Sequence, residues 1–124
     1  MTYTKVVNSR HMETKDCIFC KICEQKIPTD FLYRDREVVV FRDISPKAPV
    51  HLLIVPCRHI QSVNELTEKD SDLIAKMFFV AQKMAKREKV AKSGYKLIFN
   101  VGRGGGQMID HLHLHLLAGK RFTE

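Results

Sequence analysis

The sequence has no long apolar run: nowhere do its 124 residues approach the roughly 20 consecutive apolar positions of a membrane-spanning helix. It also has no basic and then apolar succession at its start that would be typical of a secretory signal, so we expect a cytoplasmic protein without a membrane partner. In that compartment its four cysteines are expected to be thiols or metal ligands, not a disulfide framework. No internal repeat or low-complexity tract is present, and the length supports a single domain.

Acidic residues are also scarce, because 14 Asp and Glu stand against 21 Lys and Arg, which gives a formal net charge of +7. This balance favours an anionic ligand without identifying it. Much of the excess lies between Lys76 and Lys96, where it indicates either a nucleic-acid patch or a solvated helix face. No aromatic residue that could stack on a base stands between Lys83 and Lys92, so we expect a solvated face and no nucleic-acid partner.

Hydrophobic periodicity divides the chain into a leader and one domain. Residues 1–15 show no period and are expected to be flexible, and a single domain is expected over 16–124. Helices are expected over 16–24, capped by Asp16, and from the capping box Thr67–Asp70 to Ser93–Gly94. The apolar stripe that should face the sheet comprises Leu73, Ile74, Met77, Phe78, Ala81, Met84 and Ala85. Strands are expected over 31–35, 38–43, 50–55, 95–101 and 108–117, with 50–55 central. This order predicts an α+β fold with an antiparallel sheet of about five strands and two helices.

The run from His111 to Leu117 alternates His with Leu, and it is the most informative segment of the chain. In an extended strand this alternation places all three imidazoles on one face and the leucines on the other. Imidazole can act as a nucleophile, a proton carrier or a metal ligand, so the histidine face is interpreted as a site. His113, at its centre, is the candidate nucleophile for attack on phosphorus, and His115 and His51 are candidates to contact phosphoryl oxygens or carry protons.

Four of the five residues from 102 to 106 are glycines, and this loop leads directly into the histidine run. Closely spaced glycines allow the backbone to approach a ligand, and successive N–H groups can bind an anion. A long hairpin loop is the alternative, but the position favours a phosphate cradle with Asn100 and Gln107 as neutral donors beside an oxyanion.

Cys17 and Cys20 form a C-x-x-C motif, with Cys23 three residues further on. A closed structural zinc site needs four ligands, and His59 and His111 could complete it. The alternative is a buried pair of reduced thiols; a thioredoxin-like redox pair is not expected, because no βαβ pattern surrounds the motif. Cys57 has no partner signal.

Taken together, these motifs resemble the histidine triad (HIT) family, in particular its Hint-like branch of purine nucleoside phosphoramidases. The resemblance spans about residues 16–120 in the expected order, and its motifs are Cys17-Ile-Phe, Ile27-Pro28, Phe41-Arg-Asp-Ile-Ser-Pro46, Ala48-Pro49-Val-His51, Ile54-Val-Pro56, His59-Ile60, Asn100-Val-Gly102, Gly105-Gly-Gln107 and His111 through Gly119. It implies a homodimer whose sheets join across the interface. It also implies that His113 is the nucleophile that takes a nucleoside monophosphate from its leaving group, and that His51 supports it.

The resemblance further implies ligands for the nucleotide and for a metal. His115, Gln107, Asn100 and the backbone of Gly105 and Gly106 are expected at the α-phosphate, Asp43 at the ribose hydroxyls and Ile44 beside the sugar. The apolar slot for the base is expected to comprise Phe19, Ile22, Ile27 and Phe41. The implied structural zinc ligands are Cys17, Cys20, His59 and His111. No magnesium motif is visible, so we expect metal-independent chemistry.

Two departures from the family pattern bear on function. Met108 stands where the Hint-like branch often has a serine that assists the departing amine, and the tail after Gly119 is short. We expect hydrolysis of the P–N bond of purine nucleoside phosphoramidates, of the type in which AMP is joined to an amine. The alternatives are a dinucleoside polyphosphate hydrolase, a nucleotide-binding module with little turnover, and a zinc hydrolase that uses the three histidines of the run as ligands.

Overall fold

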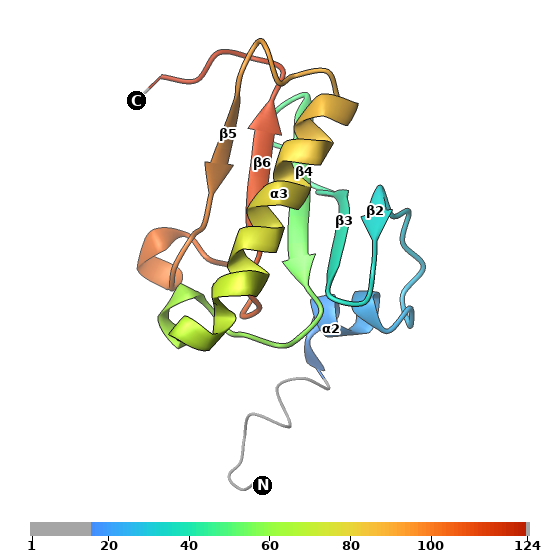
Figure 1. Ribbon diagram of the computed structural model, residues 1–124, viewed down its shortest axis with the longest axis vertical. Coiled ribbons are helices and arrows are strands. Elements are labelled where there is room, and N and C mark those ends of the chain that lie inside the picture. The colour runs from blue at the N-terminus through green and yellow to red at the C-terminus, as the bar shows by residue number, and fades with distance from the viewer. Residues whose placement is uncertain (1–15, 124) are drawn as a thin grey trace, which may run out of the picture.

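The computed structural model describes residues 16–123, in which an antiparallel five-stranded sheet carries a long helix across one face (Figure 1). The strands are β2 (Tyr33–Arg34), β3 (Val38–Arg42), β4 (Val50–Pro56), β5 (Tyr95–Ile98) and β6 (Leu114–Ala118), in the spatial order β2-β3-β4-β6-β5. The helices of this range are α2 (Ile18–Cys23) and α3 (Ser71–Arg87), with the 3-10 turns η1 (Val63–Glu65), η2 (Glu68–Asp70) and η3 (Arg103–Gly105). The predicted α+β class, the sheet and the central position of the 50–55 strand are confirmed. The leader expected over 1–15 lies outside the described residues.

Side chains of the inner strands alternate between two hydrophobic clusters, one on each face of the sheet. In β4, Leu52 and Ile54 belong to the cluster that includes the buried residues of α3, whereas Leu53 and Val55 belong to the cluster that includes α2. All four are at most 6% exposed. Since successive side chains of a strand point to opposite faces, a strand covered on both sides is apolar throughout. This explains why the 50–55 segment reads as a continuous hydrophobic run.

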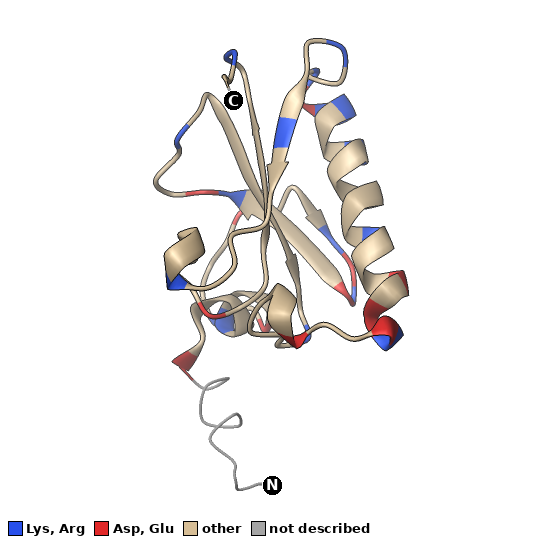
Figure 2. Cartoon of the chain, turned by 90° about the vertical axis from the view of Figure 1, so that its left-hand side faces the viewer, with Lys and Arg blue, Asp and Glu red and all other residues tan. Residues whose placement is uncertain are grey.

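Helix α3 follows the capping box that the sequence predicts. The Thr67 side chain accepts from the N–H of Lys69, and the Asp70 carboxylate accepts from the N–H of Thr67. Acidic residues lie at its N-terminal end and basic residues at its C-terminal end (Figure 2), which complements the helix dipole. The basic segment is therefore a largely solvated surface, as expected.

Three details of the predicted helices are wrong. The stripe facing the sheet contains Val80 in place of Phe78, which is 43% exposed, and α3 ends at Arg87, well before Ser93–Gly94. The chain leaves the helix at Lys89, whose φ of 62° is left-handed, so a lysine does what glycine was expected to do. At α2 the cap is the Cys17 sulfur, which accepts from the N–H of Cys20, and not Asp16. None of the helices within 16–123 is long and apolar enough to cross a membrane.

The expected strand over 108–117 is shorter than predicted, because β6 begins only at Leu114. Leu112, Leu114 and Leu116 nevertheless all pack in the cluster under α3, so the alternation extends beyond the strand. The segment before β6 is held by a hydrogen bond from the N–H of Leu112 to the carbonyl oxygen of Ile60. This places the histidines on the face of the sheet opposite α3.

Candidate active site

Strands β4 and β6 bring two histidines together on that face. His51 lies opposite Leu117 and His115 opposite Leu53, so the two rings are diagonal neighbours. Nε2 of His51 is 2.9 Å from Nδ1 of His115. The His113 ring follows, with its centroid 4.8 Å from that of His115. Antiparallel pairing thus assembles three of the histidines that the sequence singles out.

The hydrogen bonds assign the tautomers of this pair. The main-chain N–H of Lys47 donates to Nδ1 of His51 over 3.1 Å, so that nitrogen carries a lone pair. A neutral His51 therefore holds its proton on Nε2 and donates it to Nδ1 of His115. His115 in turn holds its proton on Nε2, where it can be donated to a bound anion. The carboxylate of Asp43 lies 3.4 Å from Nε2 of His51.

His113 is oriented by a main-chain acceptor. Its Nδ1 lies 2.7 Å from the carbonyl oxygen of His111, so Nδ1 carries the proton and Nε2 has a free lone pair. Burial lowers the pKa of His113. Burial, and then the charges of His113 and His51, lower the pKa of His115 to about 4. Both imidazoles are therefore neutral near pH 7, as a nitrogen nucleophile requires.

His111 points away from this group, into a second cluster formed with thiols. Its Nδ1 is 3.2 Å from the sulfur of Cys17 and 3.6 Å from that of Cys20. The other cysteine–histidine pair joins Cys20 to Nδ1 of His59 over 3.3 Å. Helix α2 thus presents both thiols of the C-x-x-C motif to histidines from two distant segments, as the sequence suggests.

The donor set of this second cluster fits a tetrahedral metal ion. Ordinary Zn–S and Zn–N bond lengths imply S···N separations of about 3.6 Å, close to those present. Nε2 of His111 lies 2.7 Å from the carbonyl of Pro56 and donates to it, which leaves Nδ1 with its lone pair towards the sulfurs. Burial raises the pKa of the Cys20 thiol to about 12, so a metal would have to displace its proton.

Asp43, His51 and His115 form a further group with metal-binding side chains. In this group the hydrogen bonds do not leave the lone pair of His51 Nε2 free for a metal. Coordination through Nε2 of His51 would move the proton of that ring to Nδ1, where it would meet the N–H of Lys47. The tautomers therefore suit the cysteine–histidine cluster to a metal and the His51–His115 pair to carrying protons.

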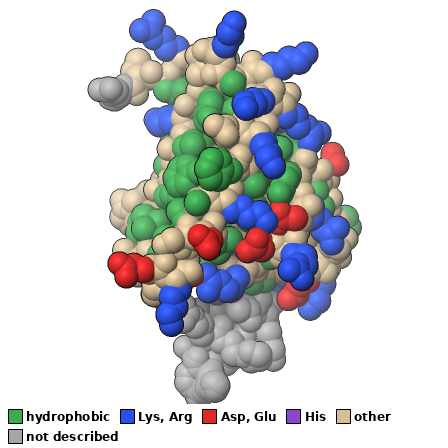
Figure 3. Space-filling model, in the orientation of Figure 1, with side chains coloured by type: hydrophobic (Ala, Val, Ile, Leu, Met, Phe, Trp, Pro, Cys, Tyr) green, Lys and Arg blue, Asp and Glu red, His purple; other side chains and the backbone are tan. Residues whose placement is uncertain are grey.

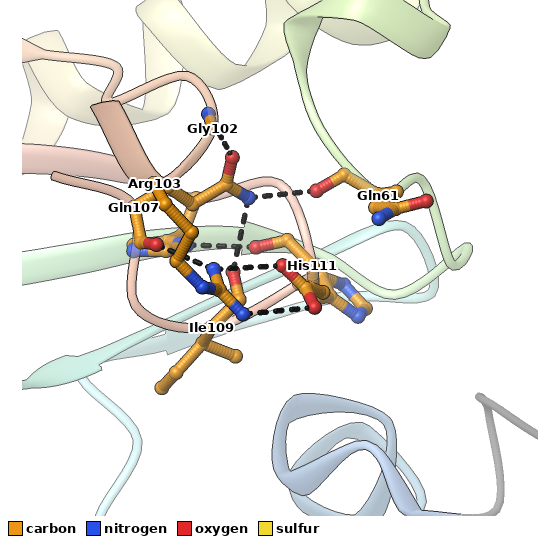
Figure 4. Close-up of polar contacts among 8 residues, drawn as sticks. Gln61, Gly102, Arg103, Gln107, Ile109 and His111 are labelled. Atoms are coloured by element: carbon orange, nitrogen blue, oxygen red, sulfur yellow. Dashed lines mark hydrogen bonds and ion pairs between the residues drawn. The ribbon is translucent and has the colours of Figure 1, made fainter. Parts of the chain in front are cut away.

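The glycine loop is shaped by Gln107, which is 2% exposed (Figure 4). Its amide nitrogen donates to the carbonyls of Gln61 and Ile109, and its side-chain oxygen accepts from the N–H of Gly102. Both amide protons are thus already used, which does not support the expected role of this side chain as a direct donor to phosphate. Gln107 instead fixes the loop to the segment after β4.

The backbone of the loop is also partly closed on itself. The N–H groups of Gly105 and Gly106 donate to the carbonyls of Gly102 and Arg103. The expectation that these two N–H groups cradle an anion is therefore not supported by this conformation. Asn100 donates one amide proton to the carbonyl of Gly105 over 2.8 Å and retains a second. Gly106, with φ of 87°, has the left-handed backbone that requires glycine.

The residues expected at the nucleoside come from the segment after β3 and from the hydrophobic cluster that includes α2. Asp43 follows β3, and its carboxylate accepts from the N–H of Ser45 over 2.8 Å. Ile44 beside it is 96% exposed, an unusual position for a large apolar side chain. The four residues of the expected base slot share the cluster under α2; Phe19, Ile22 and Phe41 are buried, and Ile27 is partly exposed. The Phe19 ring contacts His113 edge to face, with centroids 5.1 Å apart.

Sequence reasoning missed the part that Lys47 and Arg103 play. Lys47 acts through its main chain, for which no residue pattern exists. Arg103 makes a two-pronged ion pair with Asp110, at 3.0 and 3.1 Å, across the glycine loop. Opposite charges on either side of the glycine run were a visible signal for that pair.

Comparisons with known proteins agree on one family. The profile described as "Scavenger mRNA decapping enzyme C-term binding" matches residues 16–123. The purine nucleoside phosphoramidase of Escherichia coli (strain K12) is 44% identical over 106 residues, which cover 86% of this chain and 89% of that protein. An uncharacterized HIT-like protein of Buchnera aphidicola is also 44% identical, over 84% of this chain and 91% of its own.

Solved structures show the same relationship. A HIT family hydrolase from Legionella pneumophila superposes with a TM-score of 0.85 at 46% identity, covering 86% of this chain and 96% of that chain. A histidine triad protein from Clostridium difficile gives a TM-score of 0.84 at 40% identity, covering 88% and 95%.

Proposed function

Because the chain belongs to the histidine triad (HIT) family and is a HIT-type hydrolase, we propose that it cleaves the P–N bond of purine nucleoside phosphoramidates. The observation that carries this proposal is the hydrogen bond from Nδ1 of His113 to the carbonyl oxygen of His111. This hydrogen bond leaves Nε2 free for attack on phosphorus. The 44% identity to a purine nucleoside phosphoramidase supports the choice of substrate.

In the proposed reaction Nε2 of His113 attacks the α-phosphorus in line, and the P–N bond to the amine breaks. The amine takes a proton from solvent water as it leaves, and the nucleotide is held on His113 through a new N–P bond. Water then attacks phosphorus, the N–P bond breaks, and nucleoside monophosphate is released. During both steps the proton stays on Nδ1 and donates to the His111 carbonyl, which stabilises the positive charge that develops on the ring.

His115 and His51 are proposed to stabilise the phosphoryl oxygens and carry protons. The tautomer assigned above gives His115 an Nε2 proton for a phosphoryl oxygen, and His51 holds the ring by its bond to Nδ1. Asn100 offers its second amide proton to the same group. Asp43 is proposed to bind the ribose hydroxyls, with Ile44 against the sugar and the slot of Phe19, Ile22, Ile27 and Phe41 against the base.

We further propose that Cys17, Cys20, His59 and His111 hold a structural zinc ion. The separations of the donor atoms and the tautomer of His111 support this assignment. Zinc bound there would cross-link α2 to the segments before β6 and after β4. The nucleophile His113 is outside the donor set.

A homodimer is also part of the proposal. Strand β5 is at the edge of the sheet, and its outer side is unpaired within residues 16–123. Hydrophobic side chains form a patch on the face where α3 lies (Figure 3), and Phe78 and Phe79 are 43% and 61% exposed. A second copy that adds its own β5 to this edge would cover both features. Sedimentation equilibrium tests this proposal: the wild type should be a dimer, and Phe79→Glu should weaken it. A monomeric wild type would overturn the proposal.

The proposed activity is tested with a fluorogenic adenosine phosphoramidate, following release of the amine. Turnover that is lost in His113→Ala while AMP still binds supports the proposal. Faster cleavage of a diadenosine polyphosphate would indicate a P–O–P hydrolase that uses the same nucleophile. Binding of AMP with no product from either substrate would indicate a binding module.

A further inference from the structure

Arg103 is the charged residue of the glycine loop, and the described contacts of its side chain are with Gln107 and Asp110, directly after that loop (Figure 4). Nη1 donates to the carbonyl oxygen of Gln107 and to one oxygen of Asp110, and Nη2 donates to the other oxygen of Asp110. The guanidinium therefore connects three points of the loop. Both charged side chains are more than half exposed, so burial does not account for their pairing.

The bond to Gln107 has a consequence for the next residue. The carbonyl of Gln107 and the N–H of Met108 belong to one planar trans peptide, in which the two groups point in opposite directions. By holding the oxygen, Arg103 fixes the direction of the Met108 N–H. A charge-assisted bond to the oxygen also polarises the amide and strengthens its N–H as a donor.

The Met108 N–H is available for a ligand. The neighbouring N–H groups of Gly105, Gly106 and Gln107 donate to carbonyls of the loop. No hydrogen bond among residues 16–123 uses the N–H of Met108. The Met108 side chain is 80% exposed, so it does not hold this peptide in place by packing.

We propose that Arg103 and Asp110 form a latch that orients the Gln107–Met108 peptide, so that its N–H binds the α-phosphate of the nucleotide. Arg103 is then a positioning residue, not a ligand of the substrate. Asp110 holds the guanidinium in place from the other side of the loop. This inference rests on the proposed function, because it takes the phosphate of a nucleotide as the ligand of the loop.

The charges of the latch provide a sharp test. If Arg103 attracted the anionic nucleotide simply by its charge, removal of the negative charge of Asp110 would tighten binding. A latch predicts the opposite sign for that variant, because either substitution releases the peptide. Arg103→Gln and Asp110→Asn should therefore weaken binding together, and the double variant should lose no more than either single one.

Calorimetric titration with AMP and with adenosine separates the phosphate contact from the rest of the site. We expect the Kd for AMP to rise about tenfold in Arg103→Gln and in Asp110→Asn, with the Kd for adenosine unchanged. Arg103→Lys, which keeps the charge but cannot form the two-pronged contact, should resemble Arg103→Gln. Arg36→Gln removes an exposed charge outside the loop and should bind AMP as the wild type does.

Unchanged or tighter AMP binding by Asp110→Asn would overturn the latch. An equal loss for adenosine and AMP would do the same, because it would indicate general damage to the fold. If the wild type binds neither compound, the proposed function fails. The latch itself is then decided in the free protein, where the NMR order parameter of the Met108 N–H must be lower in Asp110→Asn than in the wild type.

Discussion

Nε2 of His51 and Nδ1 of His115 are 2.9 Å apart, while the N–H of Lys47 donates to the opposite nitrogen of His51. A main-chain donor thus determines which nitrogen of His115 carries a proton. The protonation pattern of the site is therefore built into the backbone between β3 and β4.

Replacing His51 should impair His115 without removing the nucleophile. We expect His51→Phe to lower kcat about tenfold with little change in KM, because His115 loses the donor that fixes its ring. His51→Gln, whose amide can still donate, should retain more activity. Steady-state kinetics with an adenosine phosphoramidate measures both. An equal loss in the two variants would mean that packing, and not the bond, matters.

The fold should lose stability in mild acid. The pKa of His115 is about 4 in the folded chain, against an ordinary value of 6.5, because of burial and neighbouring charges. Between these values the unfolded chain binds a proton that the folded chain does not. The free energy of unfolding should therefore fall as the pH is lowered from 6.5 to 4. Urea unfolding at several pH values should give a flatter profile for His115→Asn.

Metal content should depend on the cysteines of the C-x-x-C motif. We expect Cys20→Ser to reduce zinc content and to lower the melting temperature, because one of four ligands is lost. Cobalt substitution provides an independent readout, through the thiolate-to-metal absorption band. Cys23→Ser, three residues away and outside the cluster, is the matched control. Equal effects of the two substitutions would contradict the assignment.

Gly119 should tolerate no side chain. Its φ is 93°, and an added Cβ would lie 2.8 Å from Cβ of Pro49, which precedes β4. Gly119→Ala should therefore lower the free energy of unfolding by about 2 kcal/mol or more. Gly104→Ala, in a loop position with open space around it, should be nearly neutral in the same denaturation experiment.

Met108 should limit the departure of the amine. A methionine side chain cannot donate a proton, and at 80% exposure this one can be replaced without disturbing the core. Met108→Ser should raise kcat for substrates with basic amines several-fold, since a proton donor speeds the loss of a poor leaving group. Met108→Ala should not, and an equal gain in both variants would indicate a steric effect.

The sequence predicted the sheet and the capping box before α3 correctly, whereas the expected caps at Asp16 and Ser93–Gly94 were wrong. The capping box at Thr67 and the apolar run of β4 were predictable, because each is encoded in adjacent residues. The predicted strand over 108–117 was too long for a physical reason. Side chains alternate along any extended backbone, whereas a strand also needs a neighbouring strand. Before Leu114 the backbone has no strand partner among residues 16–123, and Leu112 instead donates its N–H to the carbonyl of Ile60, in the segment after β4.

The candidate site was predicted by residue type more successfully than by role. The C-x-x-C motif and its two histidines do come together. Gln107 was expected to face a ligand, but its amide is used within the fold. This difference cannot be read from the sequence, because the same glutamine side chain can bind a ligand or main-chain carbonyls. Only the folded structure shows which carbonyls surround it.

His111 serves two groups through different atoms: its ring faces the thiols, and its carbonyl accepts from His113. A substitution at this position changes the ring but leaves the chain with a carbonyl there. Evolution could therefore discard the ring, and any metal with it, while the partner of the nucleophile stays chemically the same. The two functions are separable by mutation even though a single residue provides both.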